Sequence, residues 1–151
     1  MSQIQRSIRT LLKLLLRRPI VGACIIPVLP DGRIVLIQRR DSQKWGLPGG
    51  IVDWGEDIAA TVGREMTEET GMTVERVERL VGVYSHVRRD PRFHSVCILV
   101  EARVTGDFAI QDQEEVMAVQ AFAREEIPRG SLAHDHDRQL QDYFNGATVL
   151  A

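Results

Sequence analysis

The chain has 151 residues, of which 44% are hydrophobic, and its formal net charge is -2 at pH 7. This length suits one compact domain with a single sizeable core and is too short for two ordinary domains. The small net charge provides no general basic field, which argues against stable, sequence-independent binding of nucleic acid.

The first 18 residues differ from the rest because they contain five basic residues and no acid. Drawn as a helix, this segment has an apolar face and a basic face. The apolar face comprises Ile4, Ile8, Leu11, Leu12 and Leu15, and the basic face comprises Arg6, Arg9, Lys13 and Arg17. We therefore predict an amphipathic basic helix over residues 1–18 and a globular domain over residues 19–151. Packing on the domain, packing in a homodimer, contact with a membrane surface and a role near an anionic substrate are all open for this helix.

Two strands are predicted next, over residues 20–29 and 33–38. The turn sequence Pro30-Asp31-Gly32 separates them, because proline fixes φ and glycine tolerates unusual φ values, so we expect a hairpin. Residues 41–50 are first polar and then rich in glycine, which predicts a loop.

A helix is predicted over residues 56–70. The spacing of Asp53 and Glu56 resembles a capping box at its start, and Gly71 supplies the left-handed residue that ends it. Three further strands are predicted over residues 79–84, 95–104 and 116–122, and a short helix over residues 136–143. Mixed strands with a central and a terminal helix predict an α/β or α+β layered domain.

Cys24 and Cys97 both lie inside apolar runs, where a thiol behaves as a small buried hydrophobic group. We expect reduced core cysteines and a cytoplasmic protein. No apolar run approaches the roughly 18 residues that a membrane-spanning helix requires.

Three acids of the predicted central helix, Glu65, Glu68 and Glu69, are spaced i, i+3 and i+4, so they share one helical face. Their mutual repulsion requires nearby positive charge. Arg64 lies four residues before Glu68 and offsets part of it. A divalent cation would offset the rest, and carboxylate oxygens are hard ligands that suit Mg²⁺ or Mn²⁺.

The surrounding residues extend this cluster into a longer pattern. Gly50 is followed after five residues by Glu56 and, after seven more, by the run Arg64-Glu65-Met66-Thr67-Glu68-Glu69-Thr70-Gly71-Met72. This pattern resembles the complete Nudix box, and Leu47-Pro48-Gly49-Gly50 before it adds to the resemblance. The resemblance implies a Nudix-type α/β/α sandwich with a mixed central sheet, and metal-dependent hydrolysis of a diphosphate linkage.

The resemblance also implies roles for individual residues. Glu65 and Glu69 would be the principal metal ligands, Glu68 a further ligand or a water-positioning group, and the Gly50 carbonyl an additional ligand. Glu56 would be a structural or outer-shell acid paired with Arg64, and Arg64 would belong to the catalytic residues. The box does not name the general base. Glu65 is one candidate, and the acids at the end of Gln111-Asp112-Gln113-Glu114-Glu115 are others, unless that segment is only a polar turn.

Residues 83–94 are similar to a loop of ADP-ribose pyrophosphatase-like Nudix members, and they contain Arg88, Arg89 and Arg92. We predict that these arginines bind a substrate phosphate, with a solvated charged loop as the alternative. Trp45 is predicted to stack on a base or to pack the adjacent loop. The sequence departs from its relatives in two places. Val87 stands where such members often have proline, and Ala121 stands where many have tryptophan.

The four histidines, His86, His94, His134 and His136, are predicted to be structural or exposed. His134 and His136 would approach the substrate only if the terminal helix folds back over the site.

Three functions follow from these residues. We expect hydrolysis of a nucleoside diphosphate-linked compound of the ADP-ribose type, a nucleotide-like small molecule. The first alternative is a nucleoside triphosphate pyrophosphohydrolase that cleans the nucleotide pool. The second is a non-catalytic nucleotide-binding module, which is disfavoured because such modules usually lack one or more box glutamates and all are present here.

Overall fold

The computed structural model describes residues 18–151, so the helix predicted at the N-terminus lies, apart from Arg18, outside the described residues. The described residues form two helices and eight strands. These are β1 (Ile20–Val28), β2 (Ile34–Arg39), β3 (Trp45–Gly46), β4 (Gly49–Ile51), α2 (Ile58–Thr70), β5 (Thr73–Tyr84), β6 (Ser95–Thr105), β7 (Val116–Phe122), α3 (His136–Phe144) and β8 (Val149–Leu150). Neither α2 nor α3 is long and apolar enough to cross a membrane.

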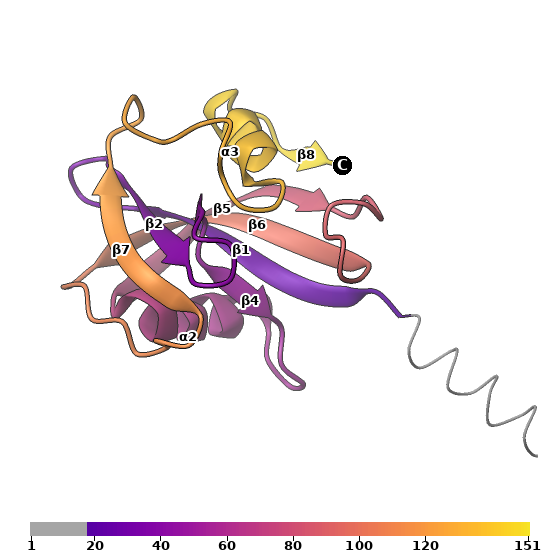
Figure 1. Cartoon of the computed structure of the whole chain (residues 1–151), viewed down its shortest axis with the longest axis horizontal. Coiled ribbons are helices and arrows are strands. Elements are labelled where there is room, and N and C mark those ends of the chain that lie inside the picture. Colours follow the sequence, from indigo (N-terminus) through magenta and orange to yellow (C-terminus); the bar gives the residue numbers. More distant parts are fainter. Residues whose placement is uncertain (1–17) are drawn as a thin grey trace, which may run out of the picture.

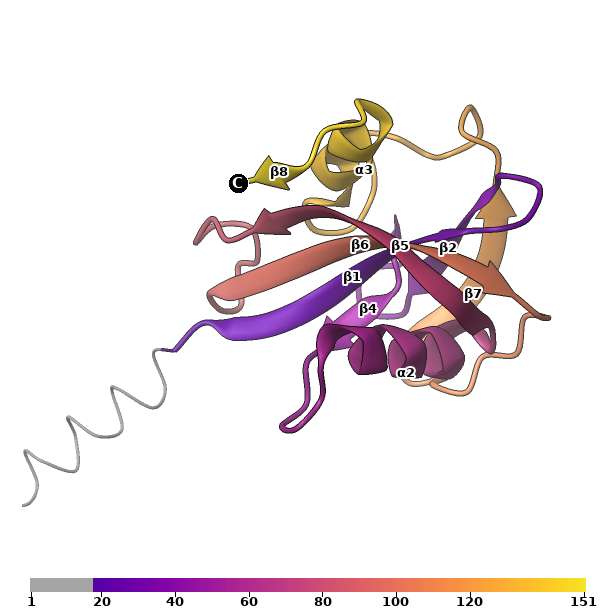
Figure 2. The same cartoon turned by 180° about the vertical axis from the view of Figure 1, so that it is seen from behind.

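The strands form one mixed sheet in the order β3-β2-β1-β6-β5-β8, with β4 paired to β1 and β7 paired to β2. Strand β1 runs parallel to β6 along its whole length and antiparallel to β2 and β4 at its two ends. Helix α2 covers one face of the sheet and α3 lies on the other face (Figures 1 and 2). The predicted α/β/α sandwich with a mixed sheet is confirmed.

The core is divided by the sheet into two apolar clusters. Ala23 and Ile25 of β1 belong to the cluster beneath α2, whereas Ile26 and Val28 belong to the cluster on the α3 side, which includes Leu140. Side chains alternate between the two faces of a strand, and here both faces are covered. This arrangement explains why the central strands read as continuous apolar runs rather than as alternating patterns.

Several elements differ from the sequence predictions. The predicted hairpin is reduced to one residue pair, Val28 with Ile34, because β3 pairs with the same edge of β2 further along, while β7 pairs with the other edge. The predicted loop at residues 41–50 contains β3 and the start of β4, which are held by β2 and β1. Strand β5 begins six residues earlier than predicted, in an exposed polar stretch that is held by its long partner β6. Strand β8 was not predicted.

The start of α2 also corrects a prediction. Its N-cap is Asp57, whose side chain accepts a hydrogen bond from the Ala60 N–H, and the helix begins at Ile58. The Glu56 side chain lies 3.3 Å from the Asp53 N–H in the preceding turn, but its main partner is Arg64. The C-terminal prediction is confirmed: Gly71 has a φ of 78° and its N–H donates to the Thr67 carbonyl.

We expect Gly71→Ala to lower the free energy of unfolding by about 2 kcal/mol or more, because alanine is strained at positive φ and packed backbone resists displacement. An added Cβ would lie 2.5 Å from the Ala109 backbone. The matched control is Gly63→Ala in the same helix, where an added Cβ would meet no atom within 4 Å. That variant should gain about 0.5–1 kcal/mol from helix propensity. Urea unfolding measures both, and equal effects would contradict the expectation.

Candidate active site

Helix α2 carries its acids at the border between the core and the solvent. Val62 and Met66 bury the helix against the sheet, and Glu65 and Glu69 lie beside them with exposed fractions of only 9% and 2%. Glu68 is more exposed, with 42% of its side-chain surface accessible. The three acids therefore share one flank of α2, as predicted. Packing of the helix on the sheet buries Glu65 and Glu69 and leaves Glu68 partly exposed.

Arg64 holds the carboxylates of this flank together. Its Nε and Nη2 donate to the two oxygens of Glu56 at 2.8 and 3.0 Å, and its Nη1 donates to Glu65 at 2.8 Å and to Glu68 at 3.2 Å. Arg64, together with a hydrogen bond from Thr61, lowers the pKa of the Glu56 carboxyl to about 2. The predicted ion pair between Arg64 and Glu56 is confirmed.

The segment before the box lies directly over the two buried acids. The Gly49 N–H donates to Glu69 Oε2 at 2.8 Å. An added Cβ at Gly50 would lie 2.1 Å from Glu65 Oε1, and one at Gly49 would lie 2.2 Å from the Ala23 carbonyl oxygen. Glycine is required at position 49, where a side chain would collide with the β1 backbone, and at position 50 a side chain would displace the Glu65 carboxylate.

Burial changes the acidity of these carboxyls. Desolvation raises the pKa of Glu69 to about 8, against the hydrogen bond from Gly49, and the negative charges of Glu65 and Glu115 raise it further. Desolvation also raises the pKa of Glu65, although Arg64 opposes the effect. Charging two adjacent buried carboxylates is costly unless a cation compensates them.

These residues suit a divalent cation by their chemistry, because buried carboxylates and a backbone carbonyl are the oxygen ligands that Mg²⁺ and Mn²⁺ prefer. Within residues 18–151, no three acidic, histidine or cysteine side chains yet converge on one point. Arg64 draws Glu65 towards Glu56 and Glu68, while Glu69 is drawn to Gly49. A bound cation would therefore compete with Arg64 for the Glu65 carboxylate.

A cleft of about 230 Å³ opens beside this acidic flank. Gly49 and Gly50, which contact the buried acids, form part of its wall. The ionisable or basic side chains that line it are Arg39, Arg89, Asp90, Arg92, Glu115, His134 and His136. Glu115 thus faces the cleft, whereas Glu114 lines a separate hollow beside Glu68.

The predicted substrate-binding residues fall in different places. Arg89 and Arg92 line the cleft, but Arg89 forms a two-point ion pair with Asp135, and Arg92 forms one with Asp90. Arg88 lies outside the cleft, in a smaller neighbouring pocket. Trp45 packs edge to face on Phe122, with ring centroids 5.1 Å apart, and does not line the cleft. Its position favours the packing role.

Arg39, His134 and His136 were not predicted to belong to the site. Arg39 is held by Asp41 at 2.9 Å and faces the cleft. The segment before α3 and the first residue of α3 line the cleft with His134 and His136, whose ring centroids are 5.4 Å apart. His134 adopts a φ of 51°, which is uncommon for a residue other than glycine and concentrates at functional sites. In the sequence, only a terminal helix that folds back over the site would link His134 and His136 to the substrate.

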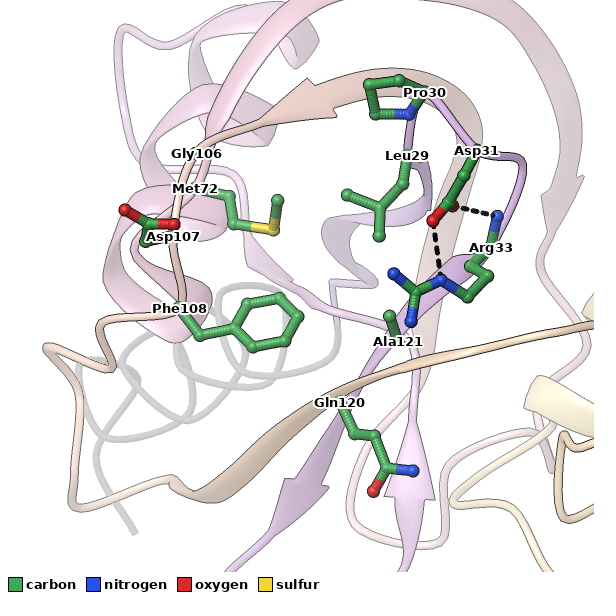
Figure 3. A pocket seen from close by; sticks show the side chains of 10 residues that line it. All are labelled: Leu29, Pro30, Asp31, Arg33, Met72, Gly106, Asp107, Phe108, Gln120 and Ala121. Atoms are coloured by element: carbon green, nitrogen blue, oxygen red, sulfur yellow. Dashed lines mark hydrogen bonds and ion pairs between the residues drawn. The ribbon is translucent and has the colours of Figure 1, made fainter.

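A larger hollow, of about 670 Å³, lies between the β1–β2 turn and the loop after β6 (Figure 3). Its lining contains none of the box acids. Asp31 and Arg33 within it pair with each other at 2.8 Å, and Asp107 is the other charged side chain of its lining. The smaller cleft beside Glu65 and Glu69 is therefore the candidate active site.

Comparison with known proteins agrees with this geometry. The NUDIX domain model matches residues 18–143. The chain is 36% identical to an ADP-ribose pyrophosphatase of Methanocaldococcus jannaschii over 117 residues, covering 76% of this chain and 67% of the relative. It is 32% identical over 126 residues to a Bacillus subtilis protein provisionally named an 8-oxo-dGTP diphosphatase, covering 83% of this chain and 80% of that protein.

Among solved structures, the NUDIX domain of Shewanella oneidensis NrtR, crystallised with ADP ribose, superposes with a TM-score of 0.78. The match covers 97% of this chain and 99% of that one at 21% identity, and it supports the fold alone. The family model and the relatives establish that the chain belongs to the Nudix family and is a Nudix hydrolase, a pyrophosphohydrolase that acts on phosphoanhydride bonds.

The buried Glu69 predicts an unusual pH dependence of stability. Its pKa in the folded protein, about 8, is higher than the ordinary value of 4.5, so the folded state retains a proton that the unfolded state loses. Without divalent cations, the free energy of unfolding should therefore fall as pH rises from 4.5 to 8. Glu69→Gln removes the ionisable group. The free energy of unfolding of this variant minus that of wild type should therefore increase by at least about 1 kcal/mol between pH 5 and pH 8. Urea unfolding in EDTA measures the difference, and parallel pH curves for the two proteins would refute it.

Proposed function

We propose that this Nudix hydrolase cleaves the diphosphate linkage of a nucleoside diphosphate-linked compound of the ADP-ribose type. The observation that carries the proposal is the pair of buried acids, Glu65 and Glu69, beneath the Gly49–Gly50 wall of a cleft lined by arginines. The name of the Methanocaldococcus jannaschii relative, an ADP-ribose pyrophosphatase, favours this substrate class.

The proposal includes Mg²⁺ or Mn²⁺ as the cofactor. Glu65, Glu69, Glu68 and the Gly50 carbonyl would hold it, and Arg64 would keep the acids close together when the ion is absent. A bound ion would neutralise the diphosphate and make a nearby water more acidic. The raised pKa values of Glu65 and Glu69 support this role, because a cation beside them would favour their charged forms.

The reaction itself requires a water to attack one phosphorus while the bond from that phosphorus to the bridging oxygen breaks. The water must lose a proton to a base. Glu115 faces the cleft and influences Glu69 electrostatically, so we infer that its carboxylate accepts this proton, with Glu65 as the alternative base. The products would be a nucleoside monophosphate and a phosphorylated partner.

Arginines of the cleft would bind the remainder of the substrate. Arg89 and Arg92 retain N–H groups beyond those used by Asp135 and Asp90, and guanidinium groups match phosphate oxygens well. Arg88 would contribute only to a substrate that extends into the neighbouring pocket. Stacking of a base on Trp45 stays a prediction. The packing of Trp45 on Phe122 disfavours it.

A second function is favoured by one observation. The Bacillus subtilis relative has a provisional name that denotes a nucleoside triphosphate substrate, so a pyrophosphohydrolase of the nucleotide pool is the alternative. A non-catalytic nucleotide-binding module is disfavoured because Glu65, Glu68 and Glu69 are all retained. The free thiols of Cys24 and Cys97 support a cytoplasmic location. A homodimer and membrane contact through residues 1–18 stay predictions.

A substrate panel tests the proposal. Purified protein with Mg²⁺ is assayed on ADP-ribose, dinucleotides, nucleotide sugars and nucleoside triphosphates, with identification of the phosphate products. We expect the highest kcat/KM on ADP-ribose-type diphosphates, loss of turnover in EDTA, and recovery with Mg²⁺ or Mn²⁺. Glu69→Gln should lower kcat at least about 100-fold while the protein stays folded. A fully active Glu69→Gln protein would refute the site, and preference for triphosphates would favour the alternative substrate.

The assignment of the base is tested with adjacent residues. Glu115→Gln should lower kcat about 100-fold or more and remove one limb of the pH–rate profile, because it removes the group that accepts the proton. Glu114→Gln is the matched control, since Glu114 faces a different hollow. Its profile should match that of wild type. An unchanged profile for Glu115→Gln would leave Glu65 as the base.

A further inference from the structure

His136 stands at the point where the C-terminal helix contacts the loop that leads into the box. The residue is 3% exposed and lies at the first position of α3. Its Nδ1 accepts a hydrogen bond from the Leu47 N–H at 3.0 Å. A Cβ at Gly46 would lie 2.8 Å from the same Nδ1, so glycine at this position permits the close approach.

Leu47, which His136 contacts, is two residues before Gly49, and Gly49 contacts the buried acid Glu69. After Leu47, the Pro48 carbonyl accepts from the Ile25 N–H at 2.9 Å, and the Gly49 N–H donates to Glu69. On the other side of the contact, the Ala133 N–H donates to the Trp45 carbonyl at 2.8 Å. The segment 45–49 is thus fixed by α3 and its preceding loop at one end and by Glu69 at the other.

The imidazole is suited to act as a permanent acceptor. Burial lowers the pKa of His136 to about 3, and the nearby charged groups Arg89 and Arg39, together with His134, act in the same direction. The ring therefore stays neutral at ordinary pH and keeps a lone pair on Nδ1 for Leu47. Its Nε2 lies 3.9 Å from the Cys24 sulfur, a weak partner, so the bond to Leu47 is the stronger of its two contacts.

We propose that His136 is a positioning residue for hydrolysis: through Leu47 it fixes the Gly49–Gly50 segment over Glu69 and Glu65. It acts on the backbone that orients the acids and does not touch the reacting atoms. The inference rests on the proposed function for its kinetic consequence. It makes α3, which lies more than 60 residues after the box, a part of the catalytic arrangement.

The test compares two substitutions of His136. His136→Leu removes the acceptor and leaves the Leu47 N–H without a partner, whereas the amide oxygen of His136→Asn lies close to the former position of Nδ1. We expect His136→Leu to lower kcat by about 10- to 100-fold, because small displacements of catalytic groups have effects of this size. KM should change less than about threefold, and His136→Asn should recover most of the kcat. Hydrogen exchange of the Leu47 amide, followed by NMR, should accelerate in His136→Leu and not in His136→Asn.

Two further variants keep the test decisive. Gly46→Ala retains the histidine but displaces it, so it should lower kcat in the same way even if His136→Leu folds poorly. Val28→Ala, in the same core cluster but near the β1–β2 turn, controls for lost stability and should leave kcat unchanged. An unchanged kcat in both His136→Leu and Gly46→Ala, or an equal loss in Val28→Ala, would overturn the proposal.

Two measurements need no substrate: hydrogen exchange of the Leu47 amide and binding of Mn²⁺. They therefore test the role of His136 independently of the proposed reaction. Weaker Mn²⁺ binding and faster Leu47 exchange in His136→Leu support positioning even if no diphosphate is cleaved by the wild type. Absence of wild-type turnover would instead refute the proposed function. Unchanged Mn²⁺ binding and unchanged Leu47 exchange would refute the role of His136.

Discussion

The burial of two carboxylates, Glu65 and Glu69, is the constraint on which the rest of the site depends. A helix that packs on a sheet normally buries apolar side chains, and buried acids are costly unless hydrogen bonds or cations compensate them. Arg64 compensates Glu65, and the Gly49 N–H compensates Glu69 only in part, as its raised pKa indicates. A divalent cation, the cofactor that we propose, would relieve the remaining cost.

The close approach of the backbone to those acids explains why two glycines precede the helix. Gly49 and Gly50 lie between β1 and the carboxylates at distances that exclude any Cβ atom. The same segment is held from the opposite face of the sheet by α3 through His136. The acids on one layer of the sandwich are therefore connected to the other layer through a few residues at the edge of the sheet. The cleft opens at this junction, beside the acids.

Features that depend on residues close together in the sequence were predicted correctly, and features that depend on distant partners were missed. The helix of the box, its end at Gly71 and the pair of Arg64 with Glu56 were predicted correctly, because they depend on residues within about two helical turns of each other. The cap at Asp57 was missed because Asp53 and Glu56 offered an equally regular local pattern. The short strands β3, β4 and β8 were missed because partners distant in the sequence, rather than their own residues, make them strands.

The sequence by itself determined the class of chemistry, because the box acids and Arg64 lie on one helix whose geometry is local and regular. It also determined the layered fold class, because strands that are covered on both faces of a sheet are apolar at successive positions. Only the tertiary structure decided which acids are buried, which of Glu114 and Glu115 faces the cleft, and that His134 and His136 join the site. These features depend on where α3 packs and how β1 lies beside β6. Such contacts between distant segments are set by the whole core and leave no pattern in any one stretch of sequence.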